Sequence, residues 1–182
     1  MAIESHVLAL GAACPDFSLP SVDGKKYALK DFAKSKGLLV AFICNHCPYV
    51  KAVEDRLLAI AKAFSEADLQ VVGICSNDAG LYPEDAPLEL LRRWEQKQYG
   101  FPYLVDEAQD VARAFDAACT PDLYLYDHNR KLYYHGRIDD NWKDASQVHK
   151  HEMKEAIEAL LRGDAPPKNQ MNTIGCSIKW KN

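Results

Sequence analysis

Hydrophobic positions divide the chain into short apolar runs and one long segment with helical spacing. Residues 38–43 and residues 69–75 are nearly continuous apolar runs, a pattern typical of strands buried on both faces of a sheet. Between them, apolar residues recur at helical spacing from Pro48 onward, so we expect a long amphipathic helix that begins near this proline. A strand–helix–strand unit of this kind implies a right-handed crossover between parallel strands.

Shorter elements are expected on both sides of this unit. The pattern predicts edge strands at 15–20 and 26–29, a helical turn at 31–32, a helix at 88–99, a strand at 103–105, a short helix at 110–117, a β-hairpin of 123–126 and 132–134, and a final helix at 148–161. This order predicts an α/β protein with a thioredoxin-like fold, in which helices flank a central mixed sheet that carries an N-terminal strand extension. We expect one domain over residues 1–165 and an extended C-terminal tail over 166–182, packed on or near the domain.

Composition and charge narrow the class of protein. The 182 residues are 48% hydrophobic and 26% charged, which is the balance of a soluble globular domain. The formal net charge is −4, and no run of like charges suggests a nucleic-acid or membrane surface, so we expect neither partner. The first ten residues lack both a basic start and a long apolar core, so we expect no signal peptide and a cytoplasmic location.

The cysteines are the strongest chemical signal. There are six of them, at Cys14, Cys44, Cys47, Cys75, Cys119 and Cys176. Cys44 and Cys47 lie at the predicted turn between a buried strand and a helix, where free backbone N–H groups and the helix dipole favour a thiolate. Their spacing supplies an attacking and a resolving thiol on one rigid element. A protonated His46 would add a positive charge beside Cys44, although it could also be a polar loop residue without a role.

A zinc site is the main alternative for this cysteine pair. Such a site normally needs four ligands, and His149 with His151 is the other close pair of candidates. A lone cysteine pair between a strand and a helix instead matches a redox motif. We therefore predict redox-active thiols, with no metal and no cofactor.

Several stretches together resemble a known family. They are ACPDFSLP at 13–20, DGK at 23–25, CNHCPYV at 44–50, SND at 76–78, CTPD at 119–122, GRIDDNW at 136–142 and GCSIKW at 175–180. The chain resembles the AhpC/TSA, peroxiredoxin-like branch of the thioredoxin superfamily, in the redoxin subgroup with a Cys-Asn-His-Cys-Pro centre. The resemblance implies a redox disulfide between Cys44 and Cys47, and a cis Pro121 that exposes the backbone of Thr120 to an extended thiol substrate.

The sequence also departs from typical peroxiredoxins. They carry a Pro-x-x-x-Thr-x-x-Cys signature, of which this chain keeps Cys47 and the following Pro48, while Cys44 replaces the threonine and Val40 replaces the proline. Because the threonine hydroxyl helps to position peroxide in the family, this departure weakens the expectation of peroxidase activity.

The remaining cysteines have different expected roles. Cys14 and Cys75 lie in apolar, strand-like settings and are predicted to be inert fillers. Cys119, close to Pro121, is either a further redox thiol or a small buried residue. Cys176 lies in the tail, from which it could reach a distant thiol.

Three functions remain open at this point. The first is a thiol–disulfide oxidoreductase with antioxidant activity, acting on protein or small-molecule thiols and disulfides. The second is a thiol-dependent peroxidase in which Cys47 reacts with peroxide and Cys44 resolves the sulfenic acid. The third is a copper chaperone built on two cysteines and a histidine. We expect a monomer or a homodimer.

Overall fold

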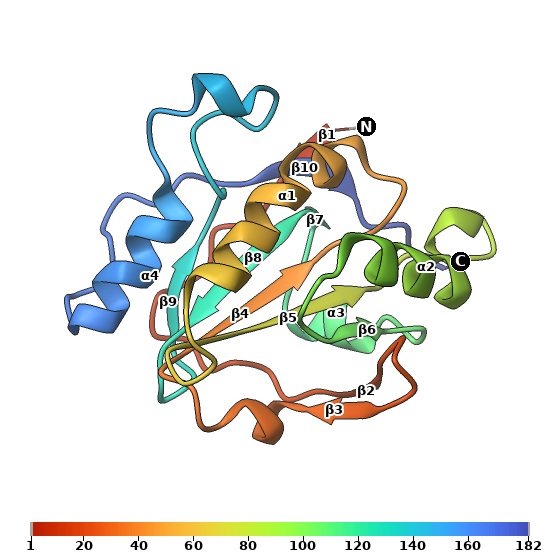
Figure 1. Ribbon diagram of the computed structural model, residues 1–182, viewed down its shortest axis with the longest axis horizontal. Helices are drawn as coiled ribbons and strands as arrows, with labels where there is room; N and C mark the ends of the chain where they lie inside the picture. The colour runs from red at the N-terminus through yellow and green to blue at the C-terminus, as the bar shows by residue number, and fades with distance from the viewer. Residues whose placement is uncertain (1, 182) are drawn as a thin grey trace.

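A five-stranded mixed sheet forms the centre of the computed structural model, which describes residues 2–181 (Figure 1). Its strand order is β6–β5–β4–β8–β9, with β4, β5 and β6 parallel and β8 and β9 antiparallel to their neighbours. The strands are β4 (Gly37–Phe42), β5 (Leu69–Cys75), β6 (Tyr103–Val105), β8 (Asp122–Tyr126) and β9 (Leu132–His135). The expected thioredoxin-like α/β architecture is therefore confirmed.

Helices cover both faces of this sheet. The α-helices are α1 (Pro48–Ala63), α2 (Pro87–Lys97), α3 (Asp110–Ala114) and α4 (Glu152–Arg162), and the 3-10 turns are η1 (Leu29–Phe32), η2 (Pro83–Asp85) and η3 (Ala145–Gln147). In Figure 1, α1, α2 and α4 lie in front of the sheet, and α3 lies behind it. Each face of the sheet therefore has its own hydrophobic core.

β4 explains why the sequence shows an unbroken apolar run. Leu39 and Ala41 point into the core beneath α1, while Val40 and Phe42 point into the core on the α3 side. All six residues of β4 are buried, because the strand lies between two neighbours and two layers of helices. The strand therefore fixes where its carboxyl end, and the loop that follows it, lie.

Two smaller sheets complete the fold. A three-stranded sheet pairs β1 (Ala2–Glu4), β10 (Ile174–Ser177) and β7 (Cys119–Thr120) in the order β1–β10–β7. The second sheet is the hairpin of β2 (Ser18–Pro20) and β3 (Lys26–Ala28), which matches the expected N-terminal strand extension. The two ends of the chain thus meet in one sheet beside the short strand that precedes Pro121.

Most expected elements match the structure, and the largest differences are in two helices and in the first expected strand, which begins at Ser18 rather than at residue 15. The final helix begins at Glu152 rather than at residue 148, because residues 145–147 form a separate 3-10 turn that the Asp144 side chain caps. The short helix ends at Ala114 rather than at residue 117, since the chain then turns through a positive φ at Asp116. The predicted division at residue 165 stays a prediction, although β10 within the tail is paired on both sides.

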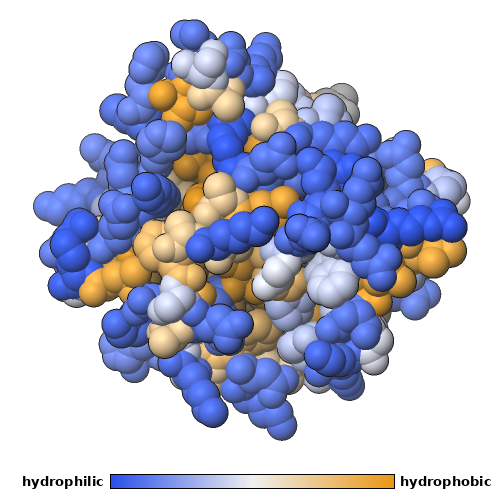
Figure 2. All heavy atoms as spheres, viewed as in Figure 1, coloured by the Kyte–Doolittle hydropathy of each residue, from blue (hydrophilic) through white to orange (hydrophobic). Residues whose placement is uncertain are grey.

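The face of the molecule that Figure 1 shows is mainly polar. Figure 2 shows hydrophilic residues over most of the face seen in Figure 1, with hydrophobic residues gathered near its middle. Within residues 2–181 there is no helix with the length and apolar character needed to cross a membrane.

A buried carboxylate supports the strand that follows Pro121. Asp122 is fully buried, and its Oδ1 lies 2.7 Å from Nε2 of His135 on β9. Its Oδ2 accepts hydrogen bonds from the Tyr124 hydroxyl at 3.1 Å and from the Ala118 backbone N–H at 3.2 Å. Buried polar groups need partners of this kind, so Asp122 joins β8, β9 and the chain before β7.

Replacing Asp122 with alanine should therefore destabilise the fold. The change leaves the His135, Tyr124 and Ala118 donors buried without an acceptor, and we expect a loss of about 3–5 kcal/mol in the free energy of unfolding. Urea denaturation of the purified protein measures this loss. Glu107→Ala is the control, because Glu107 is exposed and its replacement should change stability by no more than about 0.5 kcal/mol. Equal effects of the two substitutions would contradict the role of Asp122.

Candidate active site

Cys44 and Cys47 lie at the turn between β4 and α1. β4 ends at Phe42, and Cys47 is the N-cap residue of α1, so that Pro48 is the first residue of the helix. Cys44 is 1% exposed and Cys47 is 0% exposed. The structure thus brings the two thiols together at a helix N-terminus, as the sequence predicts, and it also removes both from water.

Thr120 lies against both thiols. The Cys47 Sγ lies 3.0 Å from the Thr120 carbonyl oxygen, to which it donates a hydrogen bond when it is protonated, and the Cys44 Sγ lies 3.3 Å from the Thr120 Oγ1. The Thr120–Pro121 peptide bond is cis, as the family resemblance implies. The predicted supporting residues Pro48, Thr120 and Pro121 therefore all lie next to the cysteine pair.

The two thiols differ in their acidity. The hydrogen bond from Cys44 is the largest cause that holds the pKa of Cys47 well below its ordinary value, and the backbone N–H of Val50 and the Cys176 thiol act in the same direction. Burial raises the pKa of Cys44, the hydrogen bond with Cys47 raises it further, and the negative charge of Asp85 acts in the same direction. The sequence left open which of the two cysteines attacks first, and these opposite shifts in pKa favour Cys47 as the thiolate.

The reduced protein should therefore hold a thiolate on Cys47 under mildly acidic conditions. At a pH of about 6 an ordinary cysteine is protonated, but the lowered pKa keeps Cys47 ionised. The thiolate ultraviolet absorbance, compared between wild type and Cys47→Ser, measures this charge. The same absorbance in both proteins at that pH would show that Cys47 is protonated.

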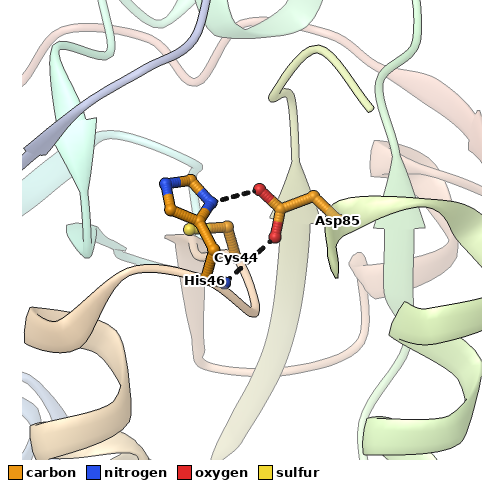
Figure 3. Close-up of side chains that lie close together, drawn as sticks. All are labelled: Cys44, His46 and Asp85. Atoms are coloured by element: carbon orange, nitrogen blue, oxygen red, sulfur yellow. Dashed lines mark hydrogen bonds and ion pairs between the residues drawn. The ribbon is translucent and has the colours of Figure 1, made fainter. Parts of the chain in front are cut away.

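His46 is bound by a buried carboxylate (Figure 3). Its Nδ1 lies 2.6 Å from Asp85 Oδ2, and its backbone N–H donates to Asp85 Oδ1 at 3.2 Å. The ring also stacks on Tyr82, with 4.6 Å between the ring centroids. Because Asp85 holds Nδ1, the orientation of the imidazole beside Cys44 is fixed.

Asp85 is the main site residue that sequence reasoning missed. Its side chain is fully buried, although it belongs to the polar loop before α2. It also accepts hydrogen bonds from the Asn45 backbone N–H and from the Asn77 side chain, each at 2.8 Å. Asn77 lies in the SND stretch that resembles the family. This stretch was the feature of the sequence that could have pointed to the hydrogen bonds around Asp85.

Cys44, His46 and Asp85 also form the one cluster of potential metal ligands found among residues 2–181. The oxygens of Asp85 already accept N–H groups from Asn45, His46 and Asn77. A cation at this position would have to displace these donors, so the cluster fits a hydrogen-bonded network better than a metal site. His149 and His151, the candidates for a zinc site, are not part of it.

Asp85→Asn should lower the pKa of Cys44. The substitution removes a negative charge that disfavours the Cys44 thiolate, so Cys44 should ionise at lower pH. The thiolate absorbance of Cys44, titrated in a Cys47→Ser background with and without Asp85→Asn, measures the shift. Glu84→Gln is the matched control, because Glu84 is the preceding residue but is exposed. An unchanged or raised pKa would contradict the electrostatic role of Asp85.

The other cysteines occupy distinct environments. Burial raises the pKa of Cys14 and of Cys75, as expected for inert fillers. Cys119 is 0% exposed, and its thiol donates to the Pro121 carbonyl oxygen while burial raises its pKa. Cys176 is only partly buried and lies close enough to Cys47 for the two thiols to shift each other's pKa.

A groove opens beside Pro121. It has a volume of about 420 Å³, and its lining includes Tyr49 and Trp142, whose ring centroids are 4.1 Å apart. Arg56 on α1 holds the loop of residues 139–142 in place, because its guanidinium bonds Asp139 and the carbonyl oxygens of this loop. The GRIDDNW stretch that marked the family therefore forms one wall of the groove.

The sequence matches the AhpC/TSA family over residues 10–135. The chain belongs to this family. A crystal structure of an uncharacterized conserved protein from Geobacillus kaustophilus is 43% identical and superposes with a TM-score of 0.95, over 100% of this chain and 97% of the other. The family and the fold are thus both shown.

Relatives with a named activity are more distant. The thiol-disulfide oxidoreductase ResA of Geobacillus thermodenitrificans is 25% identical over 71% of this chain and 70% of its own length. The thioredoxin domain of a thiol-disulfide oxidoreductase from Bacteroides vulgatus superposes with a TM-score of 0.58 at 21% identity, over 69% of this chain and 86% of the domain, which shows a common fold. The expectation of an oxidoreductase enzyme is confirmed by these relationships.

Proposed function

We propose that this protein is a thiol–disulfide oxidoreductase that cycles between a Cys44–Cys47 dithiol and a Cys44–Cys47 disulfide. The observation that carries the proposal is the pair of adjacent thiols at the N-terminus of α1, one of which has a pKa well below its ordinary value. A thiolate is the reactive form in disulfide exchange, and a neighbouring thiol can resolve the mixed disulfide.

The substrates that we propose are protein or small-molecule thiols and disulfides. The named ResA relative supports this class, and the groove beside Pro121 supports a substrate that extends beyond the reacting sulfur. Aromatic rings on one wall and charged groups such as Arg137 and Asp140 offer both apolar and polar contacts. A groove of this composition suits a peptide segment around a cysteine.

Reduction of insulin by dithiothreitol tests this function. Cys47→Ser should lower the rate to the uncatalysed value, and Cys44→Ser should lower it strongly, because each thiol is one half of the proposed disulfide. Peptide mapping of the oxidised wild type should identify the Cys44–Cys47 bond. Cys14→Ser is the control, since Cys14 lies in the core on the opposite face of the sheet. Wild-type rates in both active-site variants would contradict the assignment.

A thiol-dependent peroxidase is the second candidate. Cys47 keeps the position of the peroxide-reactive cysteine of the family, and its lowered pKa favours the thiolate that peroxide oxidises. The neighbouring Cys44 could then attack the sulfenic acid, with release of water and formation of the same disulfide.

Consumption of hydrogen peroxide separates the two candidates. Turnover that requires Cys47 and persists in Cys44→Ser, with an external thiol as the reductant, would favour the peroxidase. Peroxide consumption no faster in wild type than in Cys47→Ser would favour the oxidoreductase.

A further inference from the structure

The C-terminal strand lies against the backbone that precedes Pro121. β10 pairs antiparallel with β7, and the register places Cys176 opposite Thr120. The family resemblance suggested that this backbone would be exposed to an extended thiol substrate. In the structure the protein's own strand takes that position, and it presents a cysteine there.

The approach of the two strands is unusually close at Gly175. A Cβ atom added to this residue would overlap the carbonyl group of Thr120 and press on the Cβ of Cys119. Glycine is therefore required at position 175 for β10 to pair this closely with β7, since any side chain would force the two strands apart. The sequence is thus fitted to bring the neighbouring Cys176 near the active site.

Hydrogen bonds hold the chain on both sides of β10. Before it, the Ser5 backbone N–H donates to the Thr173 carbonyl oxygen at 2.8 Å. After it, the Lys179 backbone N–H donates to the Asn77 side chain at 2.8 Å, and this amide also bonds Asp85. The position of Cys176 is therefore built into the fold and does not depend on a mobile tail.

Cys176 also packs against the core cluster that contains Cys44 and Cys47. Its thiol lies close enough to Cys47 to lower the pKa of Cys47 by hydrogen bonding. Burial first, and then Cys47, raise the pKa of Cys176 to about 11. The part of this rise that comes from Cys47 disappears when Cys47 is oxidised, so Cys176 becomes more reactive at the moment when Cys47 carries a disulfide.

We propose that Cys176 is a third redox thiol, which forms a disulfide with Cys47 and connects the buried cysteine pair to the solvent. This inference rests on the proposed function of Cys44 and Cys47. Cys44 and Cys47 are almost completely buried, whereas Cys176 is partly exposed. An external thiol or disulfide can therefore reach Cys176 without the movement that direct contact with Cys47 requires.

The exchange among Cys44, Cys47 and Cys176 needs no oxidant or reductant from outside the protein. The Cys176 thiolate attacks the Cys47 sulfur of the Cys44–Cys47 disulfide, the S–S bond between Cys44 and Cys47 breaks, and the Cys47–Cys176 bond forms. Cys44 leaves as a thiolate and takes up the proton that Cys176 released. An external thiol then attacks Cys176 and returns Cys47 as a thiolate, with the external thiol left in a mixed disulfide on Cys176.

Disulfide mapping in a Cys44→Ala variant tests the proposal. The reduced full-length protein is equilibrated with reduced and oxidised glutathione, quenched with acid, alkylated and analysed by peptide mass spectrometry. Oxidised glutathione reacts with the partly exposed Cys176 and releases one reduced glutathione, and the Cys47 thiolate then attacks the Cys176 sulfur and displaces the second one. We expect the Cys47–Cys176 peptide to be the main product, with Cys119 alkylated.

Two variants in the Cys44→Ala background test the role of the strand. Gly175→Ala keeps every other thiol but moves β10 away from Thr120, so the Cys47–Cys176 peptide should be lost, while Gly80→Ala, a surface glycine, should leave it unchanged. The pair Cys176→Ser and Ser177→Cys moves the thiol to the opposite face of β10. It should yield glutathione bound to the cysteine at position 177 and a reduced Cys47, instead of an internal disulfide.

Two results would overturn the proposal. One is glutathione on Cys47 with a free Cys176 in the Cys44→Ala protein, and the other is equal trapping of the thiol moved to position 177, which would indicate chance encounters. Failure of the proposed function is seen separately, as the absence of insulin reduction and of a Cys44–Cys47 bond in wild type. The role of Cys176 can therefore fail while the proposed function stands, and the two failures give different results.

Discussion

Thr120 lies against all three cysteines of the active site, Cys44, Cys47 and Cys176. Its carbonyl oxygen accepts from Cys47, its hydroxyl lies beside Cys44, and its backbone pairs with the strand that carries Cys176. One residue therefore sets the position of the Cys44 and Cys47 pair relative to Cys176, which is far from them in the sequence. The buried carboxylate of Asp122 also supports this arrangement. It binds the Ala118 backbone N–H before the Thr120–Pro121 segment and the His135 ring after it.

Burial determines which of Cys44 and Cys47 can carry a negative charge. Thiolates are costly to bury, so the negative charge forms only where enough donors meet it. Cys47 has such donors in the Val50 N–H group and in the thiols of Cys44 and Cys176. Cys44 instead faces the negative charge of Asp85, which disfavours a second thiolate next to the first. The pKa of Cys44 is thus raised and that of Cys47 lowered, so we expect the reduced pair to carry one negative charge, on Cys47.

Three of the stretches that resemble the family, at 44–50, 76–78 and 175–180, are parts of one hydrogen-bonded network. Asn77 of the SND stretch binds both Asp85, which holds His46, and Lys179 of the C-terminal stretch. Gln109 joins the same region, because its side chain donates to the carbonyl oxygens of Ser76 and Lys179. The active-site loop and the C-terminus are therefore held by shared side chains, which couples the position of β10 to the surroundings of Cys44.

The local pattern of the sequence determined the strands and the helix that carry the cysteine pair. The apolar run before Cys44, Pro48 at the helix start and the helical spacing after it depend on neighbours in the chain, and these are visible without the fold. The predicted strands 69–75 and 103–105 match β5 and β6 for the same reason. The cysteine pair as a redox candidate follows from its place at this turn.

The tertiary structure alone decided which groups surround the pair. Asp85 is nearly forty residues from Cys47 and lies in a polar loop, so no local pattern shows that it is buried beside Cys44. Cys176 reaches Cys47 through pairing between strands from opposite ends of the domain, and its register depends on Gly175 and Thr120 together. The sequence therefore determined which thiols can react. Contacts between distant segments decided that Cys47 has the lowered pKa and that Cys176 lies beside it.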